Sequence, residues 1–101
     1  VVVLAVAADK AANEMIAALA PIAAPLILTR FDGERAMPLD TLCAMASGRP
    51  HHRADDLAAA LRLGLDHATS DTPLLITGSV FTAGQARQWL TRECGARGLE
   101  F

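Results

Sequence analysis

Two short stretches of this chain carry side chains that could hold an anionic ligand. Asp9 and Lys10 follow an apolar run directly, and Thr77-Gly78-Ser79 follows another. In an open parallel sheet, ligands bind outside the carboxyl ends of the strands, beside helix starts whose free N–H groups and dipole attract anions. We therefore expect a carboxylate or phosphate site where these two apolar runs end.

A helix start and an arginine extend this candidate site. Thr82 and Gln85 fit a capping box, in which the Thr hydroxyl and the Gln amide satisfy free backbone N–H groups at a helix start. We therefore expect a helix from Thr82. Arg35 could place two parallel hydrogen bonds on a carboxylate or phosphate. A solvated loop arginine is the simpler interpretation.

The histidines and cysteines predict neither a metal centre nor a disulfide. His51 and His52 would point to opposite faces of a strand, and no carboxylate or cysteine stands at a helpful spacing. His67 is expected to be exposed in the last turn of a helix, where the dipole favours it. Cys43 and Cys94 fall in two different expected helices without a CxxC pair, which favours packing roles and a reduced, cytoplasmic setting.

Composition excludes several classes of protein. The 101 residues suffice for one domain with a modest core. A net charge of −2, with nine scattered Lys and Arg, gives no electrostatic case for binding nucleic acid or an anionic membrane. The apolar run at residues 1–8 is far too short to span a bilayer and has no basic residues before it.

Strands and helices alternate along the expected fold. Residues 1–7 read as a strand buried on both faces of a parallel sheet, and Asp9 is the expected N-cap of the helix that follows. The further expected elements are a helix at 10–20, a strand at 26–28, a helix at 38–46, a loop or short edge strand at 51–53, a helix at 54–68, a buried strand at 74–76, a helix at 82–94 and a last short strand at 99–101. This order predicts an α/β fold: an open, mostly parallel Rossmann-like sheet with helices on both faces.

Three pieces of the sequence, in order, resemble the C-terminal domain of the Mur ligase superfamily, most closely its folylpolyglutamate synthase/dihydrofolate synthase branch. The pieces are Ala8-Asp9-Lys10, Leu28-Thr29-Arg30 with Arg35-Ala36, and Leu75 to Phe81 followed by Gly84. The resemblance covers about residues 1–90. It implies an ATP-dependent ligase that adds L-glutamate to a folate or dihydropteroate carboxylate, with ATP, Mg²⁺ and the pterin held by other domains.

The resemblance also implies a substrate-binding role without catalytic residues. Lys10 would hold a substrate carboxylate, because a cation near a helix start opposes the dipole unless an anion lies nearby. Ser79 would add a hydrogen bond from its hydroxyl. The whole expected set is Lys10, Ser79, Arg35, Asp9, Thr77 and Gly78. The simpler alternatives are a solvated surface lysine and an ordinary turn serine.

Departures from the family pattern make the chain look like a fragment. Ala11 stands where the family usually has a second Asp, and neither an Asp-Gly-Ala-His-Asn-Pro motif nor a Gly-rich phosphate loop occurs. We therefore expect a domain over residues 1–101 that lacks its first strand and helix and is inactive alone. Losing that strand would leave residues 1–6 as an open edge through which the fragment self-associates. A non-catalytic binding or interaction module is the alternative, and a peptidoglycan-precursor ligase is a weaker third.

Overall fold

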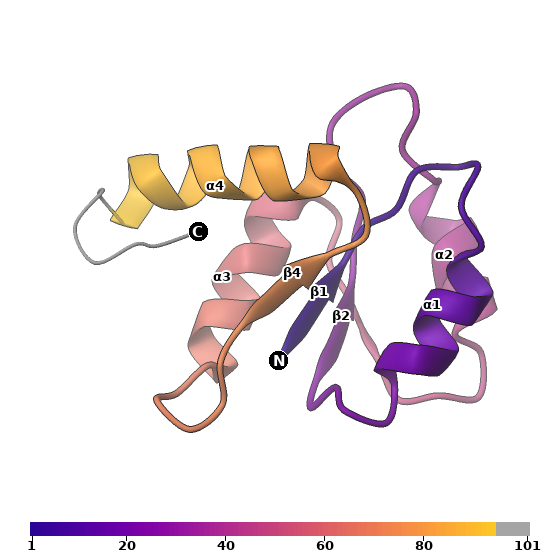
Figure 1. Ribbon diagram of the computed structural model, residues 1–101, viewed down its shortest axis with the longest axis horizontal. Coiled ribbons are helices and arrows are strands. Elements are labelled where there is room, and N and C mark those ends of the chain that lie inside the picture. Colours follow the sequence, from indigo (N-terminus) through magenta and orange to yellow (C-terminus); the bar gives the residue numbers. More distant parts are fainter. Residues whose placement is uncertain (95–101) are drawn as a thin grey trace.

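The computed structural model describes residues 1–94, in which strands and helices alternate (Figure 1). The elements are β1 (Val2–Leu4), α1 (Ala12–Leu19), β2 (Leu26–Leu28), α2 (Leu39–Met45), β3 (His52–Arg53), α3 (Leu57–His67), β4 (Leu75–Thr77) and α4 (Val80–Cys94). The four strands of this part of the chain form one parallel sheet in the order β3-β2-β1-β4. The predicted α/β fold is confirmed, and the strand expected at 99–101 lies outside the described residues.

β1 is an inner strand of this sheet. Val2 pairs with Leu26 of β2 on one side and with Leu75 of β4 on the other, so residues 1–7 are buried throughout. The prediction that residues 1–6 form an open edge is therefore wrong, because β4 occupies that side. β4 is itself an edge strand, and Leu75 is 46% exposed, so the prediction of a buried strand there is also wrong.

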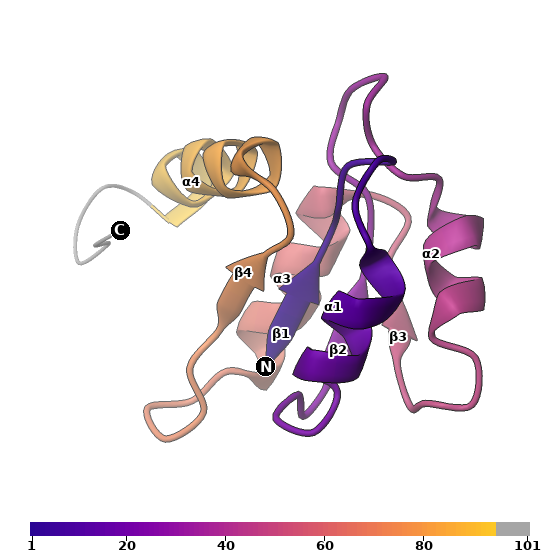
Figure 2. The same cartoon turned by 45° about the vertical axis from the view of Figure 1, so that its right-hand side comes forward.

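Helices cover both faces of the sheet. Figure 1 and Figure 2 show α1 and α2 on one side and α3 and α4 on the other. Side chains of a strand alternate between faces, so Val2 and Leu4 pack in the core under α1 and α2, while Val3 packs in the core under α3 and α4. Both faces of β1 are consequently apolar, which explains the unbroken run of aliphatic residues at the start of the sequence.

The caps of α1 and α4 are other residues than the sequence predicts. A turn closed by the hydrogen bond from the Lys10 N–H to the Ala7 carbonyl (3.1 Å) precedes α1, whose N-cap is Ala11 without a side-chain cap. Asp9 is therefore not the cap. α4 begins two residues before the predicted Thr82, because the Ser79 hydroxyl accepts the Thr82 N–H at 3.0 Å and caps the helix.

Two further expectations concern the edge of the sheet opposite β4 and the exposed residue His67. Residues 52–53 form the short edge strand β3, which is one of the two alternatives expected there, and both residues are exposed. His67 ends α3 and is exposed, also as predicted. Within residues 1–94, every helix is too short or too polar to traverse a lipid bilayer.

Candidate ligand-binding cleft

The predicted site residues share one cleft. It has a volume of about 860 Å³ and lies beyond the carboxyl ends of β1 and β4. Its lining includes all of the expected substrate-binding residues: Lys10, Ser79, Arg35, Asp9, Thr77 and Gly78. Parallel pairing of β1 with β4 explains this, because it brings the exits of two strands more than 70 residues apart to the same edge of the sheet.

Backbone pairing between the loop after β2 and the residues that follow β1 brings Arg35 to the cleft. The loop after β2 folds across the exit of β1, where the Ala8 N–H donates to the Arg35 carbonyl at 2.8 Å and Ala7 forms an antiparallel bridge with Ala36. The Met37 N–H donates to the Val6 carbonyl at 2.9 Å. These bonds fix a second cation on the wall that carries Lys10.

The charged groups of the cleft are open to a ligand. Asp9, Lys10 and Arg35 are exposed, and none of them forms an ion pair within residues 1–94. Val80 and Phe81 also line the cleft and supply the first two N–H groups of α4, which have no acceptor inside the helix. The cleft therefore combines two cations, one carboxylate and the positive end of a helix dipole.

Gly78 sets how closely α4 starts against β1. Its φ is +126°, and a Cβ built on it would lie 2.1 Å from the Ala5 carbonyl oxygen. The Ala5 N–H donates to the Thr77 carbonyl at 3.2 Å just beside it. A residue with a side chain would both strain the backbone and collide with the Ala5 backbone just after β1, so glycine is required here.

Ser79 and Thr82 form a hydroxyl network beneath the cleft. The Thr82 hydroxyl is fully buried and donates to the Ala5 carbonyl at 2.6 Å, and the two hydroxyl oxygens lie 3.0 Å apart. A hydroxyl has one proton, so Ser79 is the donor between them. The hydroxyl donation to a carboxylate expected of Ser79 is therefore unavailable while this network persists.

Phe81 lines the cleft and belongs to an aromatic pair. Phe81 is 46% exposed and stacks on the buried Phe31, with ring centroids 5.5 Å apart. The prediction that Gln85 closes a capping box with Thr82 is wrong. Instead the Gln85 amide accepts the Asp32 N–H at 2.8 Å and donates to the Asp32 carbonyl at 2.7 Å. No local signal could reveal this contact, because it joins residues 53 positions apart.

A second, smaller cleft adjoins this aromatic pair. It has a volume of about 530 Å³, is lined by Phe31, Trp89, Arg92 and the start of α3, and contains none of the expected site residues. Trp89 is buried, with the Arg62 guanidinium 5.4 Å from its ring centroid, in keeping with a packing role.

The part of the chain that the structure describes lacks a cluster of metal-binding side chains. Residues 1–94 contain no group of three His, Cys, Asp or Glu side chains able to hold a metal ion, and the sequence has no Gly-rich phosphate loop. His52 lies near His67, with ring centroids 5.8 Å apart, but no third ligand of these types joins them in this part of the chain.

Comparison with solved protein structures found proteins similar to this chain. No protein-family model and no curated protein sequence matches the chain. A crystal structure of Mycobacterium tuberculosis folylpolyglutamate synthase with ADP and AMPPCP superposes with a TM-score of 0.76 and 27% identity over 98% of this chain. The chain resembles one domain of folylpolyglutamate synthase. A second structure of that enzyme, with ADP, gives a TM-score of 0.72 and 28% identity.

The similarity to folylpolyglutamate synthase confirms the resemblance and the fold predicted from the sequence. This chain spans about a quarter of the length of the enzyme, since the match covers 24% of it in both structures. The match therefore links the chain to a ligase, and the part that its own residues play is a separate question.

Proposed function

We propose that the chain is the C-terminal domain of an ATP-dependent amide ligase of the folylpolyglutamate synthase type, and that it holds the L-glutamate to be joined to a folate or dihydropteroate carboxylate. The observation that carries the proposal is the convergence of Lys10, Arg35 and the start of α4 on one cleft. The similarity to folylpolyglutamate synthase supports the reaction class.

The charges of the cleft suit an acidic amino acid. Glutamate brings two carboxylates and one ammonium group, and the cleft offers two cations, a helix start and the Asp9 carboxylate. Lys10 would attract a carboxylate as a mobile point charge, whereas Arg35 can form two parallel hydrogen bonds. Among residues 1–94 these groups form no ion pair that would have to break for glutamate to bind.

The same proposal assigns ATP and Mg²⁺ to other parts of a longer polypeptide, as the resemblance to the Mur ligase superfamily implies. The domain would then comprise residues 1–101, work in the cytoplasm and be inactive alone. Its contribution to the reaction is to bind and orient the amino acid, which lowers the entropic cost of bringing the reacting groups together.

Binding of L-glutamate to the chain itself tests the proposed role. In an NMR titration, Lys10→Ala and Arg35→Ala should each weaken binding about three- to tenfold, as expected for an exposed or half-desolvated charge contact. Arg49→Ala is the matched control, because Arg49 is also exposed but lies after α2 and away from the cleft. Equal affinities of all four proteins would contradict the assignment.

A non-catalytic module of the same fold remains the second candidate, favoured by Ala11, which stands where the family usually has a second Asp. The coding sequence upstream of Val1 discriminates between the two. An open reading frame with a Gly-rich phosphate loop, whose product releases ADP only with both glutamate and a folate, would support the ligase. A start codon adjacent to Val1 would support the module.

A further inference from the structure

The hydroxyl network beneath the cleft has a fixed direction. The Ala5 carbonyl can only accept, so the single proton of the Thr82 hydroxyl is committed to the 2.6 Å bond with it. The Thr82 oxygen can then only accept from Ser79, at 3.0 Å. Because Thr82 is completely buried, water does not compete for these positions.

This direction determines what Ser79 can still do. Its proton is given to Thr82, and one of its two lone pairs accepts the Thr82 N–H at 3.0 Å. One lone pair remains, on a half-buried residue that lines the cleft. The Ser79 hydroxyl can therefore only accept a hydrogen bond from a ligand. The ligand group that binds to it must be a hydrogen-bond donor.

We infer that Ser79 binds the amino group of the ligand, so that the cleft selects an amino acid over a plain dicarboxylate. This inference rests on the proposed glutamate-holding function and adds to it the residue that reads the amine. The Asp9 carboxylate, on the same cleft, is the second group suited to an ammonium ion, while Lys10 and Arg35 suit the carboxylates.

The amino group and the carboxylates of the ligand are thus expected to bind different residues of the cleft. A carboxylate close to the Ser79 oxygen would meet lone pairs without a proton between them, which is repulsive, whereas an ammonium N–H would complete the bonding of that oxygen. The amine is also the group that forms the new amide in the proposed reaction. Ser79 is thus a positioning residue for the nucleophilic nitrogen.

The network can be tested without any ligand. At low temperature, the buried Thr82 hydroxyl proton should exchange slowly with water and show nuclear Overhauser contacts to Ala5. The Ser79 hydroxyl proton should show contacts to the Thr82 side chain. A Thr82 hydroxyl proton directed at Ser79 instead would reverse the network and overturn the inference.

Comparison of L-glutamate with glutarate, which lacks the amino group, tests the ligand assignment. Ser79→Gly removes the hydroxyl but keeps a residue type accepted at helix N-caps, so α4 should still start there. We expect it to weaken glutamate binding about tenfold, as for one hydrogen bond to a charged group, and to leave glutarate binding within about twofold. Ser70→Gly, in the exposed loop before β4, is the control.

The possible failures of this experiment are distinct. An equal loss of glutamate and glutarate binding in Ser79→Gly would mean that Ser79 acts on a carboxylate or only on the fold, which overturns the inference and leaves the proposed function standing. If the unsubstituted chain bound neither compound, the proposed function itself would fail and the inference with it.

Discussion

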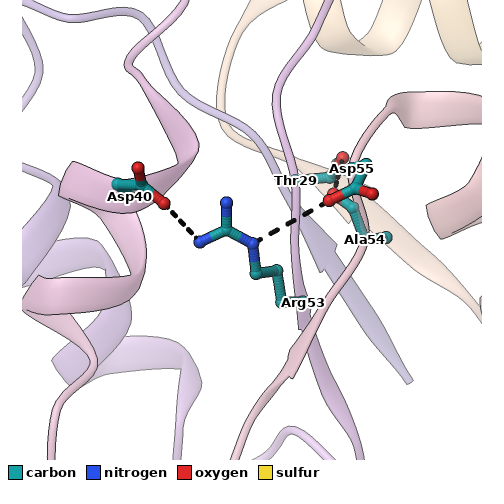
Figure 3. A network of polar contacts seen from close by, with 5 residues as sticks. All are labelled: Thr29, Asp40, Arg53, Ala54 and Asp55. Carbon is teal, nitrogen blue, oxygen red and sulfur yellow. Dashed lines mark hydrogen bonds and ion pairs between the residues drawn. The ribbon is translucent and has the colours of Figure 1, made fainter.

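Two polar networks lie near the carboxyl ends of the strands, and they are built in opposite ways. At the β1–β4 corner, Ser79, Thr82 and the Ala5 carbonyl form a neutral network around a fully buried hydroxyl. At the β3 edge, Arg53 bonds Asp40 at 2.6 Å and lies 3.9 Å from Asp55 (Figure 3). The side chains of Arg53 and Asp40 are 47% and 86% exposed.

The contrast shows which corner is constrained. A buried acceptor that loses its partner costs the full desolvation penalty of that group, so the β1–β4 network must stay complete. Exposed ion pairs are weakened by water and salt, so the β3 network can change with little effect on stability. The candidate cleft lies at the constrained corner, where small changes in geometry would alter the binding of a ligand.

Gly78→Ala should have the largest effect of any change at this corner. The new Cβ would collide with the Ala5 carbonyl, and the positive φ would be strained, which together cost about 3 kcal/mol or more of unfolding free energy. Urea denaturation measures this loss. Gly48→Ala is the control, because Gly48 also has a positive φ (+85°) but has nothing within 4 Å of the added Cβ.

If both glycine substitutions destabilised the chain equally, strain in φ alone would explain Gly78. The close approach of α4 to β1 would then not be the constraint that we describe. A clearly larger loss for Gly78→Ala than for Gly48→Ala assigns the difference to the contact with Ala5.

Thr82→Val should have the next largest effect. The substitution keeps the shape of the side chain but leaves the buried Ala5 carbonyl without this donor, which costs about 1–3 kcal/mol. Thr82→Ser keeps the hydroxyl and should restore most of the stability in the same denaturation measurement. A valine variant as stable as the unsubstituted chain would remove the distinction between the two networks.

The sequence predicts the fold well where the signal is local. The apolar run at residues 1–7 and the alternation of strands and helices were enough for the parallel sheet, and parallel strand exits placed Lys10 and Ser79 on one cleft. The edge position of β4 was not predictable in this way. An apolar run of three residues looks alike at an edge, as in β4, and in the interior, as in β2.

The hydrogen bonds that shape the cleft were missed because they join distant residues. Thr82 looks like an N-cap by its type and spacing, but its hydroxyl bonds to Ala5, 77 positions away. Gln85 likewise fits a capping box and instead holds the Asp32 backbone. In both cases the tertiary contact prevails over the local motif, and a serine three residues before Thr82 was the available sign of an earlier cap.

Arg53→Met should have the smallest effect on stability and a clear effect on a neighbouring thiol. Burial raises the pKa of Cys43, and Arg53 opposes this by its charge and a hydrogen bond. Removing the guanidinium should therefore raise the Cys43 pKa further, so that alkylation by iodoacetamide requires a higher pH. The pH profile of that reaction, measured with Cys94 replaced by serine, reports the shift.

Arg53→Met also separates the electrostatic effect of Arg53 on Cys43 from its effect on the stability of the fold. Because Arg53 and Asp40 are largely in water, Arg53→Met should shift the urea midpoint less than Thr82→Val does. The change in the alkylation profile should shrink at 1 M salt, where screening acts over about 3 Å. A loss of stability as large as that of Thr82→Val would show that the exposed network also holds the fold, and the contrast between the two corners would then fail.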